Sequence, residues 1–464
     1  MNIEKLSLSE TYSFHVVVQS GDEHFAGKLM LSPTKCTLRI TGEESDARKF
    51  GFQKRIERLL CRHRSSVVVL LGLEATGAFF GTVDRKAGIS SFEASYTVSY
   101  VIYNGSPSVH VPNCFGVALD AKEIGEWVGH THGQSEILRD YESGVFVSEG
   151  DQKLREFEQS LTGIGSLTVD YNWTAHYSPR DFEAGLRFPP TLVAFFNSAR
   201  VESEVVSFIG DLIALFAVLL GTNLTLDNIM LNIGAHRGPR PCLYFSMVVA
   251  PPRARASSLL FPLSRNMVHN QLALPEFPLQ AIDAYFQLAE GERELFKKYV
   301  RYRELENSEE RFLGYFRLLE KLTHQKEHFV DEEKLVSLAT RSTPYLERFF
   351  GDPGSVRRLL KQVLRANGSK LNAAGCIIRF MKVLPAELTD RWRFSNQHVE
   401  AICKFRNDLT HANEAEPSGT DIAVKEKFIE VLLVIALFLK LGVPAVSVAV
   451  IAGRIERYRA IVKE

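Results

Sequence analysis

Residues 395–413 read Ser-Asn-Gln-His-Val-Glu-Ala-Ile-Cys-Lys-Phe-Arg-Asn-Asp-Leu-Thr-His-Ala-Asn, and this stretch decides how the C-terminal part of the chain is interpreted. The spacing of its apolar residues predicts one amphipathic helix from Ser395 to His411. One face of that helix is apolar and anchors it in a core: Val399, Ile402, Phe405 and Leu409. Ser395 is the expected N-cap, because its hydroxyl can accept a hydrogen bond from an unpaired N–H of the first turn.

A second arc of the same helix is polar and carries a cation, an amide and an imidazole. With 3.6 residues per turn, His411 lies about 140° around the helix from Arg406, and Asn407 lies between them. Arginine keeps its charge and can hold phosphate oxygens, whereas histidine changes protonation near neutral pH and can move protons. The carbonyls at the helix end would favour a protonated ring, which suits an acid. This arc predicts chemistry on a phosphodiester, with Asn407 orienting either the histidine or the phosphate.

An arginine followed at a short distance by a histidine is a weak string by itself. It occurs at three other places: Arg58/His63, Arg393/His398 and Arg317/His324. The first lies in the basic segment 53–64, which we expect to be a solvated helix, with an RNA contact as the alternative. The second straddles a helix start, and the third lies on a helix whose apolar face is explained by packing. Context therefore favours Arg406 and His411.

The string Phe405-Arg-Asn-Asp-Leu-Thr-His411 resembles the Arg-Asn-(three residues)-His signature of HEPN domains, helical modules that cleave nucleic acid in prokaryotic defence and toxin systems. A strand-rich front half, then Phe312-Leu-Gly-Tyr-Phe-Arg-Leu-Leu-Glu320, then this motif resembles the ApeA type of anti-phage HEPN protein. The motif lies in the C-terminal third, and for residues 1–270 the resemblance is carried by length, order and strand content.

The resemblance implies a self-toxic endoribonuclease that acts in abortive infection, with tRNA as the expected substrate. It also implies a homodimer, or a dimer of dimers, whose C-terminal helices bring two copies of the motif to one two-fold cleft. The N-terminal half would then sense a phage-derived trigger and restrain the nuclease.

Composition limits the other classes of function. The chain has 464 residues, 45% of them hydrophobic, and a formal net charge of zero, so any RNA site must be a local basic patch. Six scattered cysteines and the lack of a signal pattern at the N-terminus predict a cytoplasmic protein without disulfides or zinc. The longest apolar run, Val205–Leu220, contains Asp211 and is short for a membrane span, so we expect no membrane partner.

The order of expected elements predicts an α+β multidomain protein. Residues 1–270 form a β-rich, sandwich- or barrel-like sensor domain with strands at 12–19, 24–31, 36–41, 66–73, 78–83, 92–103, 108–119, 163–173 and 242–249, a further strand or helix end at 226–233, and a buried helix at 199–220. A Pro- and Arg-rich stretch at 250–278 marks the boundary. Residues 271–464 form an all-α, HEPN-like bundle with helices at 279–303, 308–324, 332–349, 355–366, 372–384, 395–411, 421–441 and 444–462, and with Ser355 and Asp421 as further N-caps.

The function predicted from the sequence is metal-independent RNA cleavage by Arg406, Asn407 and His411, with no cofactor and no metal. The RNA 2′-OH would attack the neighbouring phosphorus, so DNA would resist. The alternative is a non-catalytic binding or regulatory protein with a degenerate bundle, and a DNA-cleaving enzyme is a poorer third. The segment Gly129-His-Thr-His-Gly133 is read as a turn rather than a metal site, and the paired glutamates 309/310 and 332/333 as helix-start charges.

Overall fold

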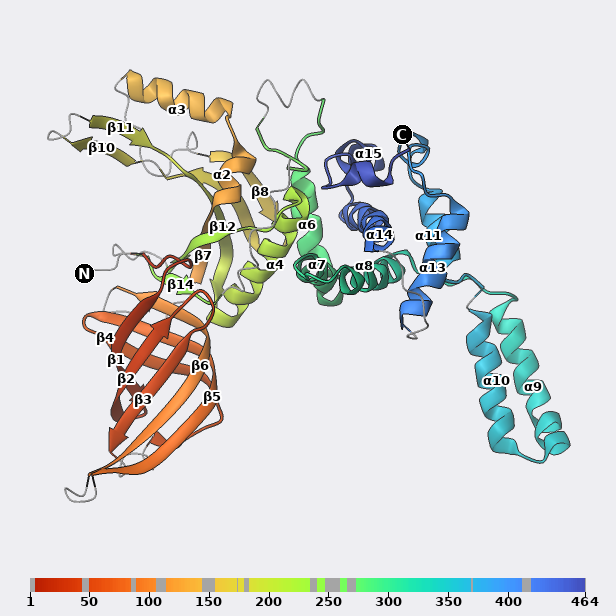
Figure 1. Cartoon of the computed structure of the whole chain (residues 1–464), viewed down its shortest axis with the longest axis horizontal. Helices are drawn as coiled ribbons and strands as arrows, with labels where there is room; N and C mark the ends of the chain where they lie inside the picture. Colours follow the sequence, from red (N-terminus) through yellow and green to blue (C-terminus); the bar gives the residue numbers. More distant parts are fainter. Residues whose placement is uncertain are drawn as a thin grey trace. The chain divides into compact units, whose positions relative to one another are not determined.

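The computed structural model describes residues 5–43, 50–84, 89–105, 114–143, 155–172, 174–178, 183–233, 240–246, 259–264, 273–368, 370–410 and 419–463. The chain divides into two compact units, Met1–Ala289 (unit 1) and Glu290–Glu464 (unit 2). Unit 1 is rich in β-strands and unit 2 is helical, which confirms the predicted fold class (Figure 1). Helix α6 (Leu279–Gln287) follows the Pro-rich stretch but belongs to unit 1.

Six strands of unit 1 close into a barrel. Their spatial order is β3 (Thr37–Glu43), β2 (Glu23–Leu31), β1 (Tyr12–Ser20), β4 (Arg55–His63), β5 (Ser66–Asp84) and β6 (Ile89–Asn104). All neighbours are antiparallel, and β3 closes the ring by pairing with β6. Along β1 the buried residues are Phe14, Val16 and Val18, because alternate side chains of a strand point to one face. That face forms the barrel core.

The basic segment at 53–64 is a strand, so the helix predicted there was wrong. Its residues Arg55–His63 form β4, which pairs with β5 from Arg55 to His63 and with β1 at Arg62–Leu60. Leu59 and Cys61 are buried two residues apart, the period of a strand. The spacing of the apolar residues also fits a helix, but the segment forms a strand because it pairs with a neighbouring strand along each of its two edges.

Strand β6 belongs to two structures at once. Beyond its pairing with β3, it pairs with β14 (Cys242–Tyr244), and from there the sheet continues as an open wing (Figure 1). The wing runs through β13 (Leu226–Asn232), β7 (Cys114–Ala121), β12 (Pro190–Arg200), β9 (Gly165–Tyr171) and β8 (Arg155–Leu161). A separate hairpin is formed by β10 (Thr174–Ser178) and β11 (Glu183–Arg187). The sequence prediction missed β8, β10, β11 and β12.

Helix α4 (Glu202–Leu220) is the core helix of unit 1 and confirms the predicted buried helix. It ends at Gly221, whose φ of 74° is a left-handed cap that glycine adopts without strain. Phe208 stacks on Phe286 of α6 with ring centroids 5.0 Å apart, and Tyr285 donates to Asp211 across 3.3 Å. Among the described residues, α4 is long and apolar enough to cross a membrane by length and composition, but 67% of that window is buried inside the protein.

Two shorter helices follow β7 in unit 1, and the first of them contacts α4. They are α2 (Lys122–Val128) and α3 (His132–Glu142). Trp127 of α2 is fully buried against Phe216 of α4, and its indole N–H donates to the carbonyl of Phe261 across 2.9 Å. The hydrogen bond satisfies the one polar atom of the ring, so the indole packs as a core residue.

Unit 2 is a set of helices built mainly around α8 and α14. Its helices are α7 (Glu290–Arg303), α8 (Ser308–Thr323), α9 (Glu332–Phe350), α10 (Pro353–Asn367), α11 (Ala373–Met381), α12 (Ala386–Thr389), α13 (Asn396–Thr410), α14 (Gly419–Lys440), α15 (Ala445–Ala452) and the 3₁₀ turn η2 (Tyr458–Ile461). The predicted helix 279–303 is split at Leu288 into α6 and α7. The predicted caps at Ser355 and Asp421 were wrong, because α10 is capped by Asp352 and α14 begins at Gly419.

Helices α9 and α10 form an antiparallel hairpin (Figure 1). The segments that lead into and out of it are joined by two backbone hydrogen bonds, from Phe329 N to Asn367 O (3.0 Å) and from Lys370 N to Glu327 O (3.1 Å). Helix α9 has no buried residue, whereas α8 has seven. The hairpin is therefore the part of unit 2 whose helices are covered least.

Candidate functional site

Helix α13 begins as predicted but is capped in a different way. Ser395 precedes its first residue, and the backbone N–H and the hydroxyl of Ser395 both lie within hydrogen-bond distance of His398 Nδ1, at 3.0 and 2.8 Å. A side chain three residues into the helix thus satisfies the N-cap backbone, which is the role that Glu or Gln plays in a capping box. His398 is used in this cap, so the Arg393/His398 string is structural.

Three of the four residues of the predicted apolar face of α13 are buried, and the fourth, Leu409, is half-buried. Val399, Ile402 and Phe405 are buried, and the Phe405 ring lies 5.4 Å from that of Phe312 on α8. The Lys425 ammonium of α14 lies 4.3 Å from the centre of the Phe405 ring, a cation–π contact. Contacts on two neighbouring helices fix the rotation of α13 about its axis, and so fix where its polar arc points.

Arg406 lies at the edge of this packed face and is held on three sides. Its Nη2 donates to Glu320 Oε2 of α8 across 2.8 Å, and its Nη1 donates to Asn407 Oδ1 across 3.0 Å. The guanidinium carbon lies 5.2 Å from the centre of the Phe316 ring. The side chain is 27% exposed. Arg406 is therefore partly desolvated and oriented, but neither sealed in the core nor free in solvent.

The predicted triad is described only in part. Asn407 is exposed and bonded to Arg406, so the structure brings these two residues together. Thr410, the last residue of α13, donates its hydroxyl to the Arg406 carbonyl across 2.8 Å. His411 follows directly in the sequence and lies outside the described residues.

Cys403 reports on the electrostatics of this arc. Burial is the main cause that raises the pKa of its thiol to about 11, and the Glu320 carboxylate adds to the shift while Arg406 opposes it. The acid and the cation are thus both close enough to act on a group one turn before Arg406. The thiol itself stays protonated at neutral pH and is a poor nucleophile.

Glu320 is the residue that sequence reasoning missed. It lies four residues after Phe316 on α8, so the ring and the carboxylate share one face of that helix and both reach Arg406. The i, i+4 spacing of an aromatic and an acid was a visible signal for an arginine partner. It did not identify which arginine, because Glu320 and Arg406 are 86 positions apart in the chain.

The remaining Arg/His strings do not form comparable sites. Arg58 lies on β4, where its Nη2 is 3.7 Å from Glu202 Oε1, and His63 Nδ1 lies 2.7 Å from the carbonyl of His15. Arg317 is exposed on α8, and His324 caps the C-terminus of that helix. The glutamate pairs 309/310 and 332/333 occupy the first turns of α8 and α9, where they stabilise the positive helix end as predicted.

A second charged cluster lies deeper in unit 2. Arg311 of α8 donates to both oxygens of Glu426 on α14, at 2.6 and 3.0 Å, and the two side chains are only 11% and 8% exposed. Nearby, Glu430 pairs with Lys427 and accepts from Tyr299. Burial, followed by the Glu430 carboxylate, raises the pKa of Tyr315 well above its ordinary value. These groups satisfy one another and join α8 to α14, which is a structural role.

The histidines of the Gly129–Gly133 segment lie at a turn and a helix start, which agrees with the preferred interpretation. Gly129 has a φ of 58°, and Thr131 caps α3, of which His132 is the first residue. His130 Nε2 lies 3.4 Å from the Ser135 hydroxyl. Among the described residues, no group of three or more His, Cys, Asp or Glu side chains is arranged to hold a metal ion.

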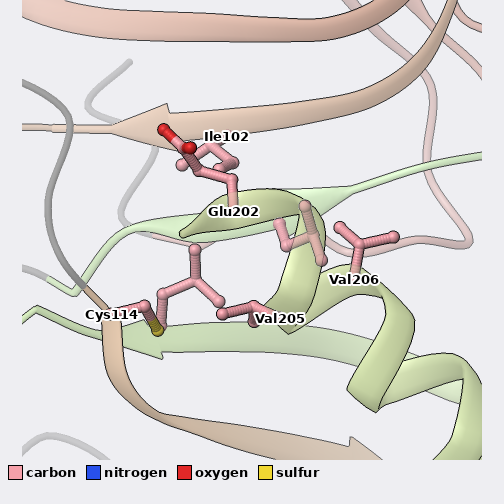
Figure 2. A pocket seen from close by; sticks show the side chains of 7 residues that line it. Ile102, Cys114, Glu202, Val205 and Val206 are labelled. Atoms are coloured by element: carbon pink, nitrogen blue, oxygen red, sulfur yellow. The ribbon is translucent and has the colours of Figure 1, made fainter. Parts of the chain in front are cut away.

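Unit 1 contains a small cavity between the first turn of α4 and the strands around β6. It is lined by apolar side chains, by Cys114 and by Glu202, whose carboxylate reaches toward Ile102 (Figure 2). The cavity volume is about 10 Å³, which is enough for one water molecule. Within the described part of the chain, Glu202 Oε1 has no hydrogen-bond partner, and its nearest cation is Arg58, whose Nη2 lies 3.7 Å away. A space of this size suits a water that hydrates the carboxylate and excludes an organic ligand.

Comparison of the chain with protein-family models, with curated protein sequences and with solved structures found no match.

Proposed function

We propose that the chain is a metal-independent endoribonuclease of the HEPN type, whose catalytic residues are Arg406, Asn407 and His411. The observation that supports it best is the state of Arg406. Its guanidinium is oriented by Glu320 and Asn407, lies against an aromatic ring and keeps 27% of its surface open to solvent. A cation that is partly desolvated and held in place interacts more strongly with a phosphate than one that moves freely in water.

The proposed reaction uses the RNA as its own nucleophile. The 2′-oxygen attacks the adjacent phosphorus and loses its proton to a base, while the bond from phosphorus to the 5′-oxygen breaks. His411 either gives a proton to that leaving oxygen or takes the one from the 2′-hydroxyl. Arg406 stabilises the negative charge that develops on the non-bridging oxygens. Asn407 positions the Arg406 guanidinium through the hydrogen bond that joins the two side chains. The products are a 2′,3′-cyclic phosphate and a free 5′-hydroxyl.

Glu320 has a positioning role in this scheme. The guanidinium has five N–H donors, and the contacts to Glu320 and Asn407 occupy two of them. The remaining donors can hold a phosphate without breaking the ion pair. The Glu320 carboxylate also lowers the local positive charge, so the site binds an anion firmly only where further contacts hold the RNA.

The wider setting of the proposal comes from the resemblance of the motif. One histidine cannot act as acid and base in the same step, so we propose a homodimer, or a dimer of dimers, whose two motifs share a cleft formed by the C-terminal helices. We further propose that the protein acts in the cytoplasm in abortive infection, with tRNA as substrate, and that the barrel and wing of unit 1 respond to a phage-derived trigger.

Growth of cells that express the chain tests the nuclease. Expression of the wild type, with the trigger of an infecting phage present, should stop growth and leave cellular RNA with 2′,3′-cyclic phosphate or 3′-phosphate ends. Arg406→Ala and His411→Ala should both be harmless, and Lys404→Ala, which changes an exposed cation on the same helix, should remain toxic.

Three results would contradict the proposal. RNA cleavage that persists in His411→Ala removes the assigned acid–base residue. Equal growth of the wild type and both variants during infection favours the alternative, a binding or regulatory protein in which the pair of Arg406 with Glu320 only joins α13 to α8. Activity of the purified enzyme that disappears with EDTA and returns with Mg²⁺ would replace the mechanism by a metal-dependent one.

A further inference from the structure

The α9–α10 hairpin and the segment that leads into it carry more exposed large hydrophobic side chains than any other stretch of similar length in the described chain. Of 21 large hydrophobic side chains that are exposed in the described residues, nine lie between Phe329 and Val363. They include Tyr345 at 68% and Phe349 at 69% exposure. A contiguous exposed patch of this kind marks an interaction surface, whereas single exposed residues do not.

Five of these side chains share one face of the hairpin, which we call the apolar strip: Leu338, Tyr345 and Phe349 of α9, and Leu359 and Val363 of α10. At about 100° per residue, the strip on each helix lies roughly 80° to one side of the half-buried residues that face the other helix. The two helices are antiparallel, so a rotation in the same sense brings both halves of the strip to the same face.

The ion pair between Glu347 and Arg357 supports this assignment. By the same helical spacing both side chains fall on the face opposite the strip, and the structure joins Arg357 Nε to Glu347 Oε1 across 2.6 Å. The rings of Tyr345 and Phe349 lie 6.0 Å apart at 21°, as expected for neighbours on one side of α9. The two faces of the hairpin are thus distinct, one apolar and one polar.

Exposed cations follow both long edges of the apolar strip. On α9 they recur every seven residues at Lys334, Arg341 and Arg348, and on α10 they occur at Arg358 and Arg365. Helix α10 contains no acidic residue. Residues 332–367 carry seven Lys or Arg against four Asp or Glu, in a chain whose formal net charge is zero. This face therefore carries a local basic patch of the kind that RNA binding by this chain requires.

The edges of like sign decide between partners. Two copies of the hairpin laid face to face would bring cationic edges together, which opposes self-association. An anionic partner fits both the edges and the strip. Proteins that bind single-stranded nucleic acid combine a cationic groove for the phosphates with exposed aromatic rings on which bases stack.

We propose that this face of the α9–α10 hairpin binds single-stranded RNA. The phosphates lie along the Lys and Arg edges, and bases stack on Tyr345 and Phe349. The choice of RNA over other anions rests on the proposed ribonuclease function. The hairpin emerges after α8, the helix that carries Glu320, so it would hold the strand whose phosphodiester reaches Arg406 and would raise affinity without taking part in the chemistry.

Fluorescence anisotropy with a 20-nucleotide labelled oligouridylate tests the proposal, using the full-length chain with His411→Ala as the background for every variant. Arg341→Gln/Arg358→Gln/Arg365→Gln should weaken binding about tenfold or more at low salt, and should reduce the slope of log affinity against log salt by about 2. Tyr345→Ser/Phe349→Ser should weaken binding by about fivefold or more without changing that slope.

Lys54→Gln/Arg55→Gln/Arg62→Gln is the matched control, because it removes three exposed cations from the rival basic segment on and beside β4. It should bind as the background protein does. Circular dichroism and melting temperature check that each variant is folded. Equal affinity of the hairpin variants and the background would overturn the inference, as would an equal loss in the control or the absence of any RNA binding.

Further measurements distinguish RNA from other partners of the hairpin face, and distinguish failure of this inference from failure of the proposed ribonuclease function. The hairpin variants could differ from the background protein in molar mass by light scattering, or in flotation with phosphatidylglycerol vesicles, while their RNA affinity is unchanged. That result would show that the face binds protein or membrane, and would reject the RNA assignment. If RNA binding does not depend on the hairpin residues but toxicity still depends on Arg406, this inference alone is rejected. Hairpin-dependent binding without any cleavage rejects the ribonuclease and leaves an RNA-binding protein.

Discussion

Two helix pairs of unit 2 follow the same sequence rule with opposite results. The pair α8–α14 buries its apolar residues, including Phe312, Tyr315 and Phe316 of α8, whereas α9 of the pair α9–α10 has no buried residue. Each of α8, α9 and α10 has apolar residues at helical spacing. The difference shows that periodicity establishes a helix and its apolar side, but not whether the protein itself covers that side. Where the chain leaves the apolar side of a helix exposed, the charges along the edges of that side indicate which partner covers it.

The sharpest test of this contrast compares one phenylalanine from each pair. Phe312→Ala removes a fully buried ring and should lower the free energy of unfolding of unit 2 by about 3–5 kcal/mol. Phe349→Ala removes a ring that is 69% exposed and should change it by less than about 0.5 kcal/mol. Urea denaturation followed by circular dichroism measures both. Similar losses for the two variants would mean that the hairpin face is covered in solution.

The next largest effect concerns charge. Glu426→Ala leaves Arg311 buried without its carboxylate partner and should lower the free energy of unfolding of unit 2 by about 3 kcal/mol. This is the low end of the usual range, because Arg311 also donates to Leu305 O, Glu306 O and Ser308 Oγ. Glu333→Ala removes an exposed first-turn glutamate of α9 and should change stability by less than about 1 kcal/mol. Thermal unfolding compares them, and a larger effect of Glu333→Ala would reverse the order of the two pairs.

The smallest effect is a shift in thiol reactivity. Cys403 is the only cysteine of the chain that is not fully buried, and its pKa of about 11 predicts alkylation by iodoacetamide whose rate is still rising at pH 10. Glu320→Gln should lower that pKa and Arg406→Ala should raise it, because the acid raises it and the cation lowers it. A thiol introduced by Leu338→Cys on the exposed strip should titrate near its ordinary value of 9.

The same raised pKa has a consequence for stability with a definite sign. The folded chain holds the Cys403 proton more tightly than the unfolded chain, so this group stabilises the fold fully below pH 9. That contribution is lost as the pH rises from 9 through 11. The exposed thiol of Leu338→Cys should have the same pKa in the folded and the unfolded chain, so it should add no pH dependence to the stability of the fold over this range. Mass spectrometry of the alkylated peptide over a pH series assigns each rate to its cysteine.

The fold could be predicted where local pattern and environment agree. Alternation gave β1 and β2, and helical spacing gave α8, α9 and α13 to within a few residues. Residues 55–63 failed because cations and leucines at that spacing fit either period, and only pairing with β1 and β5 decides between them. The short segments missed in the wing, such as β8, depend in the same way on partners distant in sequence.

The candidate site was predictable to the level of one helix. The spacing of Arg406 and Asn407 beyond the apolar face of α13 placed them correctly beside each other. Glu320 and Phe316, which hold the guanidinium, were not predictable because nothing local selects one arginine among the many for a partner on α8. The orientation of the guanidinium is thus a product of packing between α8 and α13, whereas Arg406 and Asn407 themselves were visible in the sequence.

One strand of unit 1 limits how the protein can be dissected. Along one edge β6 pairs with β3 in its first half and with β14 near its end, while β5 follows its other edge. A fragment that stops after the barrel would carry β6 away from β14 and leave unpaired N–H and C=O groups on both pieces, ready to join other chains. Genetic separation of the barrel from the wing should therefore yield insoluble halves, and a twist imposed on one would be felt in the other through the strand they share.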